Sequence, residues 1–149
     1  MPKATYSSAD LERINRFQLN FRANAGSFGY ESAPVHEVEI GKDTLVPCLA
    51  QMELREIRTD IKSDSSASDF VRLIWGYLLA LYQTSGTPSS QGNHPGLLMF
   101  DEPGQHSMAV DSQHALLKQL ASETGLQSIV AASFDEAEEV FRQATQGIQ

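Results

Sequence analysis

Apolar residues recur at helical spacing in two long segments of the chain. Residues 8–25 place an apolar residue on one stripe at every third or fourth position, and Ser8 is available to cap the start. Residues 68–84 are apolar on nearly all sides, which predicts a buried helix rather than a surface one. The apolar positions are Leu11, Ile14, Phe17 and Phe21 in the first segment and Phe70, Leu73, Ile74, Tyr77, Leu78 and Leu81 in the second.

Two shorter segments alternate apolar with charged residues and predict strands. Residues 35–40 alternate valine and isoleucine with glutamate, and residues 51–57 follow the same period of two. We expect these strands to form a small antiparallel element. The following stretch from Ser85 to Pro95 is rich in serine, glycine and proline, which predicts a loop.

The last third of the chain alternates between strand and helix patterns. Residues 96–100 and 127–132 predict apolar strands, residues 111–124 predict a helix, and a capping box at residues 133–136 opens a final helix. Strands of this kind, separated by helices, predict a parallel sheet flanked by helices, so the fold class is α/β. The apolar positions expected to face inward are Leu116, Leu117 and Leu120 in one helix and Ala137, Val140, Phe141 and Ala144 in the other.

The charge of the chain is acidic and unevenly distributed. The 149 residues carry a formal net charge of −8, and 41% of them are hydrophobic, enough for the core of one domain. Residues 1–62 carry eight bases and nine acids, whereas residues 63–149 carry three bases and ten acids. No Lys or Arg lies between Arg72 and Lys118. Such a surface repels phosphate, so direct binding of this chain to nucleic acid or to an anionic membrane is disfavoured.

The cysteine content and the hydrophobic runs bear on the compartment. Cys48 is the one cysteine, so no internal disulfide can form, and a reducing, cytoplasmic setting is expected. The polar start lacks the apolar centre of a signal peptide, and the longest apolar run, residues 73–82, is too short to span a bilayer.

The most informative motif is an apolar strand that runs into two acids, Asp101 and Glu102. Four apolar residues followed by Asp-Glu is the form of a Walker B strand. At the carboxyl end of a parallel strand, the first carboxylate can hold Mg²⁺ and the second can polarise an attacking water. A turn that needs a polar start is the alternative explanation of the same two acids.

A serine-rich stretch, residues 63–69, leads into the buried helix. The hydroxyl and backbone N–H groups of such a helix start can bind an anion, although plain N-capping by Ser66 or Ser68 explains the same residues. Arg72 is the one base nearby, and it could support an anion site or pair with Asp69 at helical i, i+3 spacing.

Taken together, these motifs resemble the C-terminal lobe of an ABC-type ATPase head of the kind found in SMC-like coiled-coil ATPases, which belong to the P-loop NTPase superfamily. The resemblance covers about residues 28–145 and rests on three segments: Ser65–Asp69, Leu73–Leu81 with its Ile-Trp pair, and Gly92–Gln105 with its Asn-His-Pro-Gly entry into the strand. It implies a partial head at residues 28–149, and residues 1–27 would be the helical root of a coiled coil.

The resemblance assigns roles to individual residues. Asp101 would serve Mg²⁺ and Glu102 would be the general base for ATP hydrolysis. Ser65, Ser66 and Ser68 fall in the signature, where Ser66 would donate to the γ-phosphate of ATP held by another subunit. Ser107 would belong to the D-loop that contacts the partner head.

The sequence departs from the family pattern in ways that bear on function. No Walker A motif is present, because the nearest candidate at residues 41–44 lacks the first glycine and has Asp43 where Ser or Thr should follow the lysine. The signature lacks its two glycines, and Phe134 stands where a switch histidine is usual. A Walker A lobe, on a preceding segment or a separate chain, would therefore have to complete the site in a homo- or heterodimer.

Two functions follow from this pattern. The chain is either half of an ATPase, active only with a Walker A lobe, or an inactive fragment that acts as a protein-interaction module. In both cases strands normally contributed by the missing lobe would leave an apolar part of the sheet exposed, so we expect self-association unless a partner covers it.

Overall fold

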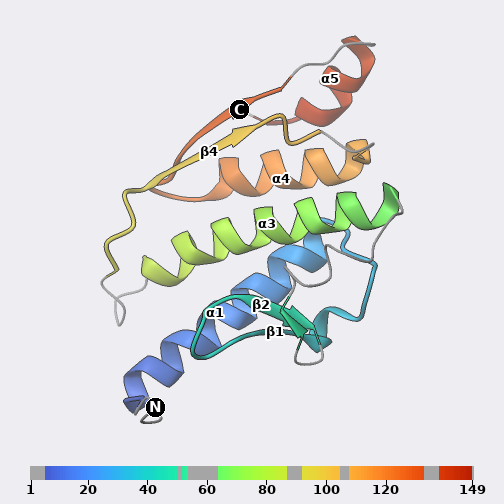
Figure 1. Ribbon diagram of the computed structural model, residues 1–149. Coiled ribbons are helices and arrows are strands. Elements are labelled where there is room, and N and C mark those ends of the chain that lie inside the picture. Colours follow the sequence, from blue (N-terminus) through green and yellow to red (C-terminus); the bar gives the residue numbers. More distant parts are fainter. Residues whose placement is uncertain are drawn as a thin grey trace.

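The computed structural model describes residues 6–49, 52–53, 64–86, 92–104, 108–132 and 138–148. Within these ranges four α-helices, a 3-10 turn and two small sheets form a mixed α/β fold (Figure 1). The elements are α1 (Ser8–Ser27), η1 (Val35–Glu37), β1 (Val38–Ile40), β2 (Pro47–Leu49), β3 (Met52–Glu53), α3 (Asp64–Ser85), β4 (Leu97–Asp101), α4 (Val110–Ser122), β5 (Gln127–Ala131) and α5 (Glu138–Thr145). The α/β class is confirmed.

Helix α1 packs along α3 and forms the first of two hydrophobic cores (Figure 1). The ring of Phe17 meets that of Tyr77 edge to face, with 5.0 Å between the centroids. The helices approach each other closely at Gly76, where a Cβ atom would lie 3.2 Å from the backbone nitrogen of Ala25. The glycine that interrupts the apolar run of α3 therefore allows a close approach of α1. The buried members of this core are Phe17, Phe21, Ala25, Tyr30, Val38, Ile40, Leu73 and Ala80.

The start of α1 is capped by Ser7 rather than by Ser8, so the predicted cap is wrong by one residue. The Ser7 hydroxyl accepts from the backbone N–H of Asp10 at 3.1 Å, and the Asp10 carboxylate accepts from the backbone N–H of Ser7 at 3.2 Å. This reciprocal pair is a capping box that needs a carboxylate three residues after the cap, and Asp10 supplies it only for Ser7.

The first sheet confirms the predicted antiparallel element. Its strand order is β1-β2-β3, with Val38 opposite Leu49 and Cys48 opposite Glu53. Residues 35–37 form a 3-10 turn instead of the start of the strand, and β2, which begins with Pro47, has no alternating pattern that predicts it. The predicted continuation of β3 through residues 54–57 lies outside the described residues.

The second sheet consists of β4 and β5, which pair in parallel as predicted, with Met99 opposite Ile129 and Asp101 opposite Ala131. One face of it packs on α3 and α4 and forms the second core (Figure 1). Helix α3 contributes opposite sides to the two cores. The buried members of the second core are Phe28, Trp75, Leu79, Leu98, Phe100, Met108, Leu116 and Leu120.

The other face of the second sheet, which we call the outer sheet face, carries the exposed side chains Leu97, Met99 and Ile129. Their exposed fractions are 36%, 66% and 46%. The parallel pairing and the helices beside it are therefore as expected, whereas a mainly parallel sheet with helices on both faces is not seen in the described residues. In the described part of the chain the parallel sheet has two strands, and helices cover one of its faces.

Three helix positions expected to face inward are exposed. Ile74 and Leu81 of α3 are 43% and 37% exposed, because α1 and the second sheet cover two sides of this helix and leave strips between them. Phe141 of α5 is 50% exposed, whereas Ala144 is fully buried. Among the described helices, none combines the length and the apolar content needed to cross a membrane.

Candidate functional site

The Asp-Glu pair lies at the carboxyl ends of β4 and β5. Asp101 is the last residue of β4, and its side chain is exposed. Because the parallel register pairs Asp101 with Ala131, the last residue of β5, both strands end at the same rim. The side chain of Asp101 forms no hydrogen bond or ion pair with any other residue that the structure describes. Its carboxylate is therefore available to a ligand at this rim.

Glu102 adopts a backbone conformation that is unusual for a residue with a side chain. Its φ angle is +48°, in the left-handed region, and its N–H donates to the carbonyl of Ala131 at 2.7 Å. That conformation costs an L-residue about 1–2 kcal/mol, and such strain concentrates at functional sites. The half-buried Glu102 thus ends the strand pairing at a strained turn, immediately beside the free carboxylate of Asp101.

The segment that follows Glu102 is held by α4. Gln113, in the first turn of α4, is 8% exposed and donates from its amide to the carbonyl of Met108 at 3.2 Å. A Cβ atom at Gly104 would lie 3.1 Å from the Gln113 side-chain oxygen. Gln113 therefore packs against both described ends of the segment between Glu102 and α4. The sequence pattern did not single out Gln113. The signal available was a glutamine in the first turn of the helix that follows the Asp-Glu pair.

The serine-led start of α3 lies partly outside what the structure describes. Ser65 and Ser66 are helical in their backbone, and their side chains are not among the described ones. Ser68 is 7% exposed and Asp69 4% exposed, so this side of the first turns faces the interior. Ser107 lies outside the described residues, and so does Phe134.

Asp69 and Arg72 form a buried polar cluster. The Asp69 carboxylate accepts from the guanidinium of Arg72 at 2.6 Å, from the backbone N–H of Ser32 at 2.7 Å and from that of Glu31 at 3.3 Å, and the Ser32 hydroxyl donates to it as well. Burial, together with the negative charge of Asp69, raises the pKa of Tyr30. The pairing alternative for Arg72 is confirmed: it holds Asp69 in place.

This cluster also links α3 to α4. The Nε of Arg72 donates to the hydroxyl of Ser112 at 3.2 Å, in the first turn of α4. In Figure 1 α3 begins on the right of the molecule, and β4 and β5 both run towards that side. The structure therefore connects the third turn of α3 to the helix that follows the Asp-Glu pair.

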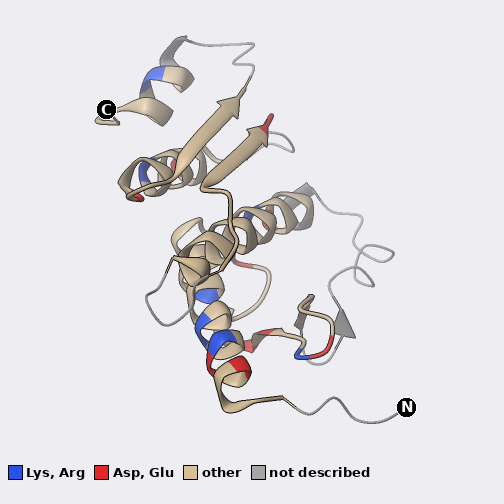
Figure 2. Cartoon of the chain, turned by 90° about the vertical axis from the view of Figure 1, so that its left-hand side faces the viewer, with Lys and Arg blue, Asp and Glu red and all other residues tan. Residues whose placement is uncertain are grey.

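Positive charge lies away from the rim. Figure 2 shows Lys and Arg concentrated along α1, whereas the parallel strands are nearly free of them. In the described chain, Arg72 is committed to Asp69 and Ser112, and no Lys or Arg lies between it and Lys118. The rim by itself thus lacks the cations that a triphosphate needs.

The carboxylates are too few for a metal site built by the described residues alone. Among these residues, no group of three or more His, Cys, Asp or Glu side chains could hold a metal ion. Magnesium, however, commonly takes one or two carboxylates and completes its shell with phosphate oxygens and water. Asp101 fits that use, and it requires a phosphate ligand from elsewhere.

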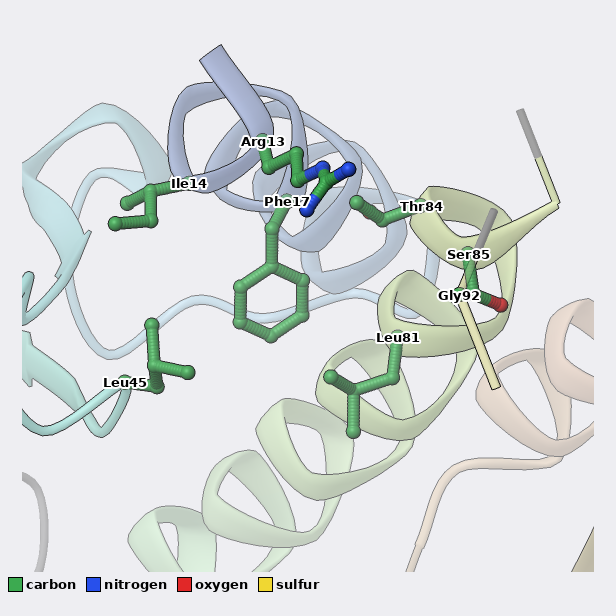
Figure 3. Close-up of a pocket in the computed structure, with 8 residues that line it drawn as sticks. All are labelled: Arg13, Ile14, Phe17, Leu45, Leu81, Thr84, Ser85 and Gly92. Carbon is green, nitrogen blue, oxygen red and sulfur yellow. The ribbon is translucent and has the colours of Figure 1, made fainter. Parts of the chain in front are cut away.

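A separate groove lies between α1 and the end of α3 (Figure 3). Its volume is about 260 Å³, and Phe17 faces the space between Leu45 and Leu81 with Arg13 to one side. None of the predicted site residues lines this groove. Its lining is largely apolar, and Arg13 is the charged residue among the eight that line it.

Comparisons with models of protein families, with curated proteins and with solved structures found no match to this chain.

Proposed function

We propose that this chain is the C-terminal part of an ATP-hydrolysing, SMC-like head, and that a Walker A lobe completes its site. The supporting observation is the free carboxylate of Asp101 beside the strained Glu102, at the carboxyl rim of two parallel strands. Open α/β sheets bind their ligands at this rim. The same two acids at a closed surface would instead favour a simple turn.

The two carboxylates would have different roles in hydrolysis. Asp101 would hold Mg²⁺, directly or through water, and Glu102 would accept a proton from the attacking water. Bound magnesium supplies charge neutralisation on the phosphates. The left-handed backbone of Glu102 gives the two neighbouring carboxylates a relative placement that continued strand would not.

The missing positive charge explains why a second lobe is required. A triphosphate carries several negative charges, and residues 63–149 carry ten acids against three bases. A P-loop supplies backbone N–H groups and a lysine to this charge. We therefore expect the chain alone to bind ATP poorly.

The serines would act in trans. Ser65 and Ser66 would face ATP held by the partner head, Ser66 as the donor to its γ-phosphate, and Ser107 would lie in the contact between heads. Ser68 is buried next to the Asp69–Arg72 cluster, which favours a role in supporting this turn. Helix α1 would be the root of the coiled coil.

The alternative function is that of a catalytically inactive interaction module. The outer sheet face favours it, since exposed apolar surface serves binding whether or not nucleotide is present. The two functions differ in what the Asp-Glu pair does after assembly.

The test is to assemble the chain with a Walker A lobe and to measure phosphate release. Glu102→Gln should lower turnover by roughly 10²–10⁴, the usual contribution of a general base. Glu39→Gln, an exposed acid on β1, is the matched control and should leave turnover unchanged. Assembled activity that survives Glu102→Gln would exclude the enzymatic function and leave the interaction module.

A further inference from the structure

The groove between α1 and the end of α3 combines an apolar floor with a single cation. Phe17 faces the space between Leu45 and Leu81, and Arg13 lies at one side of it (Figure 3). The guanidinium of Arg13 forms no hydrogen bond or ion pair with any other residue that the structure describes. The groove therefore offers a ligand apolar contact and one positive charge.

The acids next to Arg13 on α1 are engaged with other groups. Glu12 pairs with Arg16 at 3.3 Å. Asp10, one turn before Arg13, belongs to the capping box, and its carboxylate accepts from the hydroxyl of Ser7 at 2.7 Å. These hydrogen bonds lower the pKa of Asp10 more than the charge of Arg13 does. The positive charge of Arg13 thus remains available to an anion in the groove.

One wall of the groove is built from a residue in an unusual backbone conformation. The φ angle of Leu45 is +56°, in the left-handed region that a bulky side chain rarely adopts. Its N–H donates to the carbonyl of Gly41 at 2.7 Å, and its carbonyl accepts from the hydroxyl of Tyr77 at 3.0 Å. The Leu45 side chain is nevertheless 43% exposed, so its own burial does not account for the strained backbone. Strain of this kind concentrates where a fold holds a ligand.

We propose that this groove binds a small monocarboxylate with an apolar body. The apolar part would lie on Phe17 between Leu45 and Leu81, and the carboxylate would pair with the guanidinium of Arg13. A single guanidinium matches one carboxylate, whereas the net charge of −8 opposes a ligand that carries several negative charges.

The size of the groove selects a small molecule rather than a protein partner. Its volume is about 260 Å³. A cavity of roughly 150 Å³ holds benzene, so this volume suits a ligand of about ten non-hydrogen atoms, the size of octanoate. Eight described residues line the groove, whereas a protein interface of standard size takes about 20–30 residues on each side.

This site is independent of the proposed ATPase function, because neither Asp101 nor Glu102 lines the groove. Titration of the full chain with octanoate, followed by amide chemical shifts in NMR, measures the binding directly. The shifts should cluster at Ile14, Phe17 and Leu81 and give a dissociation constant of about 0.1–1 mM, and Mg-ATP should not change them. No binding at 5 mM octanoate, or shifts centred on the parallel strands, would overturn the proposal.

Matched variants test the role of the charge. Arg13→Gln should weaken octanoate binding about threefold to fivefold and leave octanol, which has no charge, within twofold. Arg16→Gln removes the same charge from the same helix outside the groove and should leave both ligands within twofold. Equal weakening of octanoate by both variants, or unchanged octanoate binding in Arg13→Gln, would refute the pairing with Arg13.

A second pair of variants locates the apolar contact. Leu81→Glu places a carboxylate inside the groove and should weaken octanoate at least tenfold. Leu19→Glu introduces the same charge at a residue of α1 that is 64% exposed and lies outside the lining, and it should leave octanoate within twofold. Circular dichroism should show both variants folded, since Leu81 is 37% exposed. Octanoate that binds folded Leu81→Glu as tightly as the unchanged chain would place the ligand elsewhere and refute the proposed site.

Discussion

The strongest prediction for stability concerns the buried pair of Asp69 and Arg72. Asp69→Ala removes a carboxylate that accepts from a guanidinium, a hydroxyl and two backbone N–H groups. The two N–H groups belong to the exposed residues Glu31 and Ser32, where water can replace the lost acceptor. Most of the loss therefore comes from Arg72, whose side chain is 12% exposed and would keep its charge without a counter-ion.

Removing one partner of a buried ion pair destabilises by about 3–5 kcal/mol. Arg72 keeps its bond to Ser112, so we expect the lower end of that range, about 3 kcal/mol. Arg72→Met should also destabilise, and the double variant with Asp69→Ala should lose clearly less than the two single losses combined, because removing both partners leaves no unpaired charge.

Equilibrium unfolding in urea is the assay. Trp75 is the single tryptophan, is 2% exposed and lies in the second core, so its fluorescence reports the loss of tertiary structure. Asp111→Ala, at an exposed acid of α4, is the control and should change the free energy of unfolding by less than 1 kcal/mol. A loss below 1 kcal/mol in Asp69→Ala, or strict additivity in the double variant, would show that the pair is not a coupled buried cluster.

Three further predictions follow from single positions. Gly76→Ala should destabilise by about 1–3 kcal/mol despite the better helix propensity of alanine, because its Cβ would press on the backbone of Ala25; a more stable variant in urea would contradict the close approach of α1 and α3. Glu102→Gly should be more stable than Glu102→Ala by about 1 kcal/mol, since both variants lose the side chain and glycine alone adopts the left-handed conformation without strain; a glycine variant no more stable than the alanine variant would refute the strain. Hydrogen bonds from Ser7 lower the pKa of Asp10, so this carboxylate stabilises the fold above its unfolded pKa and the contribution disappears as the pH falls through the lowered folded value; Ser7→Ala, which loses the cap bond from the Asp10 N–H at every pH, should therefore lower the thermal midpoint more at neutral pH than at pH 2, and a loss that is equal at both would disprove the linkage.

The sequence predicted the elements with strong periodicity and failed where tertiary context decides. Residues 68–84 lie within α3, and the strand of residues 96–100 is β4 to within one residue, because long apolar patterns leave few alternatives. Strand β2 was missed, since Pro47–Leu49 gains its structure from pairing with β1 and not from local preference. An exposed apolar part of the sheet was expected, but the face that carries Met99 could not be singled out, because an apolar strand has the same sequence pattern whether one face or both are covered.

The candidate site was likewise predicted only in part. The Asp-Glu pair could be placed at the end of a strand from the apolar run alone, and the structure has Asp101 at that end. The left-handed turn at Glu102 carries no sequence signal, because glycine or asparagine would be the usual residue there. Nor could the link from Arg72 to Ser112 be foreseen, since the two residues are forty positions apart and meet only after α3 and α4 pack.

The position of α3 between the two cores has a consequence for cooperativity. Neither α1 with its antiparallel sheet nor the parallel strands with α4 can bury their apolar side chains without this one helix. The two halves should therefore not open separately: amide hydrogens in α1 and in β4 are expected to exchange through one common unfolding event, with those of central α3 the slowest of all.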